Sequence, residues 1–169
     1  MHTGENIEAP TRDLPAVRVG RRDDLDGICE VQRRAGRSSS EKFTNAISDA
    51  IGDSKRLVVV AEAAGELAGW ATTRYWPDHE AAAPAGHYLM GITVAPDQRR
   101  LGIGRSLIGA RVEWIHHRAD SVMFFANARN TASLTAHQRW PFHEISRGPE
   151  FRGVKFEGGL GLLLRAQLN

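Results

Sequence analysis

Apolar residues along the chain follow two spacings, and each spacing predicts a different element. A run of β-branched residues at 57–61 predicts a buried strand, and a turn at 64–66 joins it to a hairpin partner at 67–76. Apolar positions three and four apart at 104–118 instead predict an amphipathic helix. The same reasoning places the remaining strands at 17–19, 88–94, 122–126, 142–146 and 160–164, and the remaining helices at about 24–35, 41–51 and 131–140.

The order of these elements predicts a mixed α/β fold. A strand, a crossover helix and a second strand over 88–126 require one parallel pair, and the other strands can pair antiparallel. We therefore expect a mostly antiparallel sheet of six to seven strands, with helices on both faces. Pro10, Pro15 and scattered charges predict a flexible lead-in over 1–16, followed by a single domain over 17–169.

Composition narrows the class of protein without naming its chemistry. The 169-residue chain is 41% apolar and 25% charged, which is ordinary for a globular protein, and it contains no apolar run long enough to span a membrane. The N-terminus lacks the apolar core of a signal peptide, and Cys29 is the only cysteine, so we expect a cytoplasmic protein without a membrane partner. The net charge of +2 is spread along the chain, which argues against a nucleic-acid partner. No metal site is expected.

The segment Arg99-Arg100-Leu101-Gly102-Ile103-Gly104 separates the strand at 88–94 from the helix that follows it. Its glycines let the backbone approach a ligand closely, and the start of the helix presents free N–H groups at the positive end of the helix dipole. Arg99, Arg100 and Arg105 add charge that suits a pyrophosphate. A Walker loop would need Gly-Lys-Ser or Gly-Lys-Thr, and a dinucleotide fingerprint would need a glycine where Leu107 stands. A plain glycine turn is the alternative.

Two segments together resemble the GNAT superfamily of N-acetyltransferases. The first is Val94-Ala95-Pro96 followed by Arg99-x-x-Gly102-x-Gly104, which resembles that family's acetyl-CoA-binding motif. The second is Asn127-Ala128-Arg129-Asn130-Thr131-Ala132-Ser133 with Phe142, which resembles its second motif, although Trp140-Pro141 replaces the usual glycine before the phenylalanine. The order of elements also matches over 17–166. The resemblance implies the GNAT fold, acetyl-CoA as cofactor, and acetyl transfer to an amine.

The resemblance also implies where the cofactor lies. The backbone amides of the glycine turn would hold the pyrophosphate, and the pantetheine arm would follow the edge of the strand at 92–94, where a backbone N–H polarises the acetyl carbonyl. Asn127 and Asn130 would bond the arm and Ser133 would face it, while Asn130 can also cap the next helix. The implied cofactor-binding residues are Ile92, Thr93, Val94, Arg99, Arg100, Leu101, Gly102, Ile103, Gly104, Arg105, Asn127, Asn130 and Ser133.

The candidate proton-transfer residues depart from the family pattern. Similar enzymes often carry a tyrosine that protonates the leaving thiolate, and this chain has His137 there. Histidine titrates near neutrality, so His137 is the candidate acid, and an ordinary solvated helix histidine is the alternative. The strand before the turn lacks the glutamate that many relatives carry. The candidate bases are therefore His87, Glu150, Glu157 or water.

The acceptor is expected to be a primary amine of a small molecule. The first helices and the loops at 77–86 and 148–159 should form its pocket, where aromatic and acidic side chains would suit a cationic amine. The alternatives are a protein N-terminus or lysine as acceptor, or a non-catalytic CoA-binding module. Dimers are common in similar proteins, so a homodimer is also considered. The candidate wall residues, each of which can instead be core, are Glu41, Trp70, Tyr75, Trp76, Asp78, His79 and Tyr88.

Overall fold

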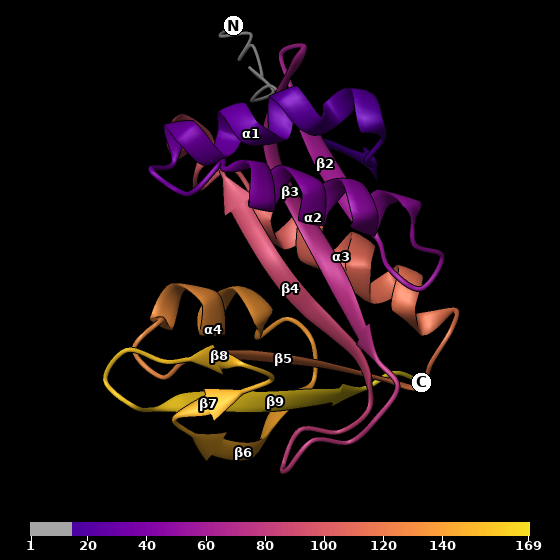
Figure 1. Ribbon diagram of the computed structural model, residues 1–169, viewed down its shortest axis with the longest axis vertical. Helices are drawn as coiled ribbons and strands as arrows, with labels where there is room; N and C mark the ends of the chain where they lie inside the picture. Colours follow the sequence, from indigo (N-terminus) through magenta and orange to yellow (C-terminus); the bar gives the residue numbers. More distant parts are fainter. Residues whose placement is uncertain (1–14) are drawn as a thin grey trace, which may run out of the picture.

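The computed structural model describes residues 15–169 (Figure 1). The lead-in expected over 1–16 lies outside the described residues except at its end, where Ala16 already belongs to a strand. The strands are β1 (Ala16–Val19), β2 (Val58–Ala63), β3 (Glu66–Trp76), β4 (Gly86–Val94), β5 (Ser121–Asn127), β6 (Phe142–Gly148), β7 (Glu150–Phe151), β8 (Val154–Lys155) and β9 (Gly161–Gln167). The helices are α1 (Leu25–Arg34), α2 (Glu41–Gly52), α3 (Ile103–His116) and α4 (Thr131–His137), with short 3-10 turns η1 (Arg22–Asp24) and η2 (Pro96–Gln98).

Seven strands form one sheet in the order β1-β2-β3-β4-β5-β9-β6, and β4 with β5 is the parallel pair. This confirms the expected mixed, mostly antiparallel sheet. The sequence did not reveal the β7–β8 hairpin, because strands of two residues carry no apolar period. The last helix ends at His137 rather than near Trp140, since Pro141 disfavours helical geometry in the residue before it. No helix within 15–169 is both long and apolar enough to cross a membrane.

Helices cover both faces of the sheet. Side chains alternate along β2, so Val58 and Val60 pack with α1 and α2, whereas Val59 and Ala61 pack with α3. Figure 1 shows α1 and α2 in front of the strands and α3 behind them. Ser40 caps α2, with its hydroxyl accepting from the Phe43 amide at 3.3 Å, as the serine run before this helix predicts.

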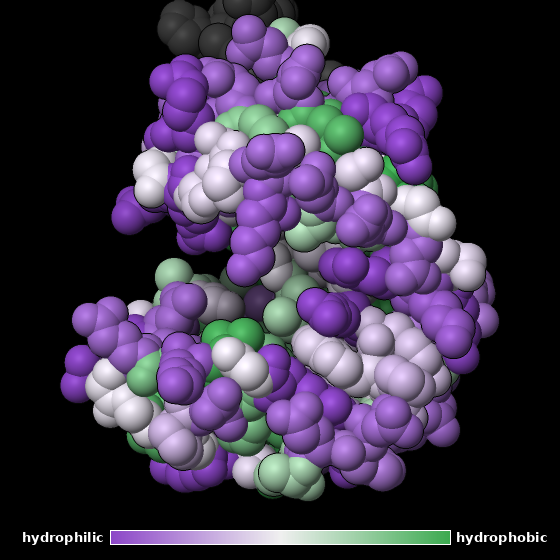
Figure 2. Space-filling view, viewed as in Figure 1, coloured by the Kyte–Doolittle hydropathy of each residue, from purple (hydrophilic) through white to green (hydrophobic). Residues whose placement is uncertain are grey.

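The neighbouring strands β4 and β5 are paired at one position and then separate. Tyr88 opposite Met123 is their paired position. Beyond it β4 bulges: Met90 faces Thr72 and Ile92 faces Ala71, so Gly91 is an extra residue. Figure 1 shows the two strands diverging, and Figure 2 shows the surface hollowed between the upper and lower parts of the molecule. The divergence leaves one edge of β4 without a neighbouring strand.

Candidate functional site

The glycine turn presents unpaired backbone amides at the start of α3. Gly102 is the N-cap residue with φ of 82°, and no side chain caps the helix. Arg100 also adopts a left-handed conformation, with φ of 65°. The first N–H groups of α3 therefore face open space at the positive end of the helix dipole. This geometry suits a phosphate.

The surroundings of Gly104 distinguish a ligand-binding turn from a plain glycine turn. Its backbone is helical, so its conformation does not require glycine. A Cβ built there would meet nothing closer than Val94 Cγ2 at 3.9 Å, so packing does not require glycine either. A ligand that approaches the backbone would account for a glycine that neither the backbone conformation nor the packing requires.

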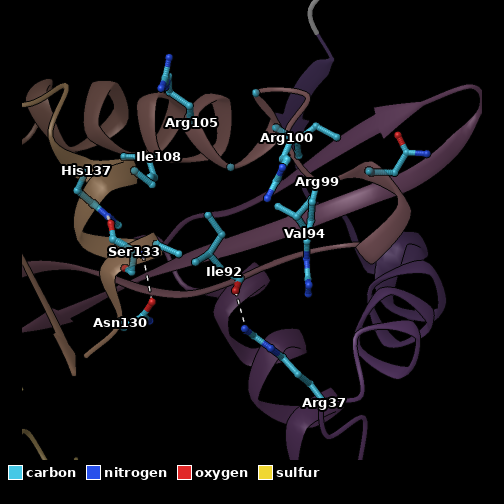
Figure 3. Close-up of a pocket in the computed structure, with 16 residues that line it drawn as sticks. Arg37, Ile92, Val94, Arg99, Arg100, Arg105, Ile108, Asn130, Ser133 and His137 are labelled. Carbon is cyan, nitrogen blue, oxygen red and sulfur yellow. Dashed lines mark hydrogen bonds between the residues drawn. The ribbon is translucent and has the colours of Figure 1, made fainter. Parts of the chain in front are cut away.

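A groove of about 880 Å³ runs from this turn along the open edge of β4 to α4 (Figure 3). Among the described residues, four arginines and no acidic side chain line it. Such a lining favours a polyanionic ligand. The groove is lined by Arg37, Ile92, Val94, Gln98, Arg99, Arg100, Gly102, Ile103, Gly104, Arg105, Ile108, Asn130, Ala132, Ser133, Ala136 and His137.

Most of the residues implied for cofactor binding therefore meet in one groove, but three do not line it. The Thr93 side chain is buried on the other face of β4, where its hydroxyl lies 2.7 Å from Gln32 Oε1. The Leu101 side chain is exposed. Asn127 holds a loop instead, since its Nδ2 donates to the Glu157 carbonyl at 2.7 Å and its Oδ1 accepts from the Arg129 amide at 3.0 Å.

Arg37 is a groove residue that the sequence did not reveal. It lies between α1 and α2, and its Nη1 donates to the Ile92 carbonyl at 2.8 Å (Figure 3). The same Nη1 also donates to Thr93 Oγ1 at 3.0 Å. The Ile92 carbonyl belongs to the strand edge expected to pair with the pantetheine arm. Only the fold brings residue 37 to residue 92, so local sequence patterns carry no signal for this contact.

Asn130 caps α4 with its side chain. Its Oδ1 accepts from the Ser133 amide at 3.1 Å, which confirms the capping interpretation. The same residue lines the groove, as does Ser133. Both residues thus lie where a cofactor arm can reach them.

His137 is buried in the wall of the groove, so the solvated-helix interpretation is wrong. It is 4% exposed and stacks on Phe124, with 3.8 Å between ring centroids. Its Nδ1 lies 2.7 Å from the Ser133 carbonyl, and a carbonyl only accepts, so Nδ1 carries the proton. Burial and, to a smaller extent, the charge of Arg111 lower the pKa of His137 to about 4, so the ring is neutral at pH 7.

This tautomer bears on the acid role proposed for His137. A neutral ring with its proton on Nδ1 presents a lone pair at Nε2, and no described residue donates to it. To protonate a thiolate from Nε2 the ring would have to change tautomer or gain a charge that its burial disfavours. The acid role stays a prediction, and the geometry counts against it.

The two other candidate catalytic residues lie away from the groove. His87 is buried between Tyr75 and Trp114, and burial together with Arg118 lowers its pKa. Glu150 is exposed on β7 and borders a separate hollow of about 400 Å³. Both were candidate bases because the strand before the glycine turn carries no glutamate, but neither lines the groove. The backbone carbonyl of Glu157 holds Asn127, and its side chain does not line the groove either.

A smaller cavity of about 130 Å³ lies at the inner end of the groove, where β4 and β5 begin to separate. It shares Ile92, Ser133 and His137 with the groove. Arg111 also lines this cavity. No role was predicted for it from the sequence, although it is a charged residue on the otherwise apolar face of α3. The lining residues are Leu89, Met90, Gly91, Ile92, Arg111, Phe124, Phe125, Ser133 and His137.

The aromatic residues suggested for the acceptor pocket are largely engaged within the protein. Trp70 is buried and its Nε1 donates to Gln32 Oε1 at 2.9 Å, and Tyr88 is buried with its hydroxyl donating to the Pro84 carbonyl at 2.7 Å. The core interpretation is therefore correct for both. Trp76 already has guanidinium groups over its ring, from Arg74 at 5.0 Å and Arg152 at 5.1 Å. These rings do not form an empty aromatic box for a cation.

Comparison with known proteins decides the family. The model of the acetyltransferase (GNAT) family matches residues 25–142, which is more than half of the chain. The chain belongs to the GNAT family. This GNAT protein is therefore an acetyltransferase, and acetyl-CoA is the cofactor of its family. No curated protein sequence matches it.

Solved structures agree on the fold of this GNAT protein. It is similar to a ribosomal-protein-alanine N-acetyltransferase from Brucella melitensis (22% identity, TM-score 0.73, covering 90% of this chain and 99% of that one). It is also similar to a phosphinothricin acetyltransferase from Sinorhizobium meliloti in complex with acetyl-CoA (17% identity, TM-score 0.71, 92% and 89%). The ribosomal-protein-S18-alanine N-acetyltransferase from Escherichia coli shares 19% identity with a TM-score of 0.69 (92% and 94%). At these identities the likeness shows the fold, and the named acceptors differ from one structure to the next.

Proposed function

We propose that this chain transfers the acetyl group of acetyl-CoA to a primary amine of a small molecule. The observation that carries the proposal is Gly104, whose missing side chain serves neither backbone nor packing and opens the start of α3 to a pyrophosphate. The arginine-lined groove continues from there to the inner cavity, a path suited to a long cofactor with a reactive end.

The strand edge supplies the chemistry at that reactive end. In this proposal the Ile92 N–H donates to the acetyl carbonyl, and attack by the amine nitrogen forms the N–C bond as the C–S bond breaks. No carboxylate from the described part of the chain lines the groove, and the low pKa of His137 makes it a weak base. We therefore assign the proton of the amine to water rather than to a side chain.

Hydrogen bonds between the loop at 77–85 and the β7–β8 hairpin favour a small acceptor. Arg152, in the turn of the β7–β8 hairpin, donates through Nη2 to the carbonyls of Asp78, Ala83 and Pro84 at 2.6 to 3.0 Å. The loop at 77–85 and the hairpin are thereby fastened to each other. A peptide acceptor would need an open channel, and this closure supports a compact substrate instead.

The test is release of free thiol from acetyl-CoA with a panel of small primary amines and, in parallel, a panel of peptides with free N-termini or lysines. Mass spectrometry of each product identifies the acetylated atom. The proposal expects turnover with small amines and at most traces with peptides. Turnover with peptides alone would establish the protein acceptor, and tight CoA binding without turnover on either panel would establish a non-catalytic module.

A further inference from the structure

Arg111 is a fully buried cation without an acidic partner. It lies on the inner face of α3 and is 1% exposed. Among the described residues, no carboxylate lies within ion-pair distance of it. Burial lowers its pKa to about 9, so the guanidinium stays charged at pH 7. An unpaired buried charge is costly, and the site that retains one requires an explanation.

Two of the three hydrogen bonds of Arg111 converge on the bulge of β4, and the third binds a carbonyl of its own helix α3. Its Nη1 donates to the Thr72 carbonyl at 2.8 Å and to the Met90 carbonyl at 2.7 Å, while Nε donates to Leu107 at 3.2 Å. Thr72 and Met90 are the paired residues next to the extra residue Gly91. A bulge disrupts the ladder locally, and the arginine satisfies carbonyls on both strands at that point.

The bulge determines which way Ile92 faces. The Ile92 carbonyl accepts from Arg37, which approaches from outside the sheet. In an extended strand the N–H and C=O of one residue point to the same side, so the Ile92 N–H also faces the open edge. This N–H is the one assigned above to the acetyl carbonyl. Arg111 therefore fixes the backbone segment that presents the donor.

The remaining nitrogen of Arg111 has no hydrogen-bond partner among residues 15–169. Nη2 is buried and has no hydrogen-bond partner. The residue lines the inner cavity together with Gly91, Ile92 and His137. A guanidinium with an unused donor thus borders the space where the reacting carbonyl would lie, inside a low-dielectric surrounding that strengthens its field.

We propose that Arg111 is the positioning residue of the acyl-transfer site, holding the β4 bulge so that the Ile92 N–H meets the thioester carbonyl and placing a positive charge beside the oxygen. The inference rests on the proposed acetyl transfer. When the amine nitrogen attacks, the π electrons of the carbonyl move to oxygen. The resulting oxyanion then expels the CoA thiolate, which takes a proton from water, while the amine proton leaves to water. Arg111 stabilises the oxyanion through the bulge and through its charge.

The experiment compares Arg111→Met, Arg111→Lys and the control Arg118→Met, which removes an exposed arginine just beyond the same helix. Arg111→Met removes the cost of burying an unpaired charge but leaves the Thr72 and Met90 carbonyls without their donor, so we expect a less stable protein that still folds, which circular dichroism checks. We expect CoA affinity within about threefold of wild type and kcat lowered by about a hundredfold, the range seen when an oxyanion donor is removed. Arg111→Lys should recover part of the rate, because an ammonium can still reach one carbonyl.

The deciding readout is the infrared carbonyl band of bound acetyl-CoA labelled with ¹³C at the carbonyl. In wild type and Arg118→Met the band should lie below its frequency in free acetyl-CoA, and in Arg111→Met it should return toward the free value. An unchanged band or an unchanged kcat in Arg111→Met would overturn the inference. The band is measured without an acceptor, so it tests the role of Arg111 even if no amine is acetylated. A lack of turnover with every amine would reject the proposed function instead.

Discussion

The two ends of the groove use the same kinds of side chain for different purposes. At the outer end, Arg99, Arg100 and Arg105 are exposed beside the glycine turn. At the inner end, Arg111 and His137 are buried, and burial has lowered the pKa of each. Water screens the outer charges, so they attract and hold an anion without altering its reactivity. At the inner end the surrounding has a low dielectric constant, so the charge of Arg111 acts strongly on a neighbouring carbonyl.

The outer end of the groove therefore binds the ligand, and the inner end acts on its reactive carbonyl. Variants at the outer end should change affinity and leave the intrinsic rate alone, whereas variants at the inner end should change rate or stability and leave affinity alone.

The largest expected effect is at the glycine turn. Gly104→Val should lower CoA affinity by about a hundredfold or more, because the side chain occupies the space that the pyrophosphate needs and removes hydrogen bonds to a charged ligand. The new Cβ meets only Val94 Cγ2 at 3.9 Å, so the melting temperature should change by a few degrees at most. Calorimetric titration with CoA measures the affinity.

A matched pair of variants controls for backbone strain. Gly102 and Gly153 have φ of 82° and 81°, and a Cβ at either would meet nothing within 4 Å. Gly102→Val and Gly153→Val should therefore lose similar stability, on the order of 1–2 kcal/mol. Only Gly102→Val should lose CoA binding. Equal affinity in the two variants would mean that the phosphates bind elsewhere.

The next effect is the acid sensitivity that His137 confers on the fold. Its pKa falls from 6.5 in the unfolded chain to about 4 in the folded one, so the unfolded state binds more protons between these values. Stability is then fully present above about pH 6.5 and is lost as the pH falls toward 4, by up to about 3 kcal/mol. Urea unfolding from pH 4.5 to 7.5 should show a steeper loss in wild type than in His137→Phe. His87, whose pKa is also lowered, contributes in the same direction in both proteins.

A smaller effect is expected at the cap of α4. Asn130→Ala should lower the free energy of unfolding by about 1 kcal/mol, because the Ser133 amide loses its acceptor. Asn130→Ser retains a capping oxygen and should recover that stability. If the Asn130 amide also bonds the cofactor, the serine variant will still bind CoA more weakly than wild type. Equal affinity would restrict Asn130 to the cap.

The smallest effect is expected for the rate of His137→Phe. The phenyl ring can keep the stacking on Phe124, and the tautomer shows that wild type offers no proton at Nε2. We expect single-turnover acetyl transfer at saturating acetyl-CoA to change by less than about threefold. A general acid contributes about a hundredfold to ten-thousandfold, so a drop of that size would establish the acid role and reject our interpretation of the ring.

The sequence predicted features that depend on neighbouring residues. The seven-stranded sheet, the parallel pair and the glycine turn all follow from periodicity and from residue types within a short window. His87 and Glu150 were candidate bases in place of the missing glutamate, and the fold directs both away from the groove. Arg37 reaches Ile92 across 55 residues, a contact that no local pattern contains.

Arg111 and His137 show a different limit. Both are visible in the sequence, and an arginine on the apolar stripe of a helix is itself a signal of a buried function. Their chemistry depends on partners, namely the Met90 and Ser133 carbonyls, that set which atoms are satisfied and which remain free. The tautomer of a histidine follows from its hydrogen bonds and cannot be read from its place in a motif.

The central claim is that one groove, from the glycine turn to the separation of β4 and β5, holds the acyl donor. Titration of ¹⁵N-labelled protein with acetyl-CoA, followed by amide chemical shifts, tests it directly. The account predicts the largest shifts at Gly102–Arg105, at Ile92–Val94 and at Asn130–Ser133, with little change at residues 146–152. Shifts concentrated around 146–152, with the amides of the glycine turn unmoved, would contradict it.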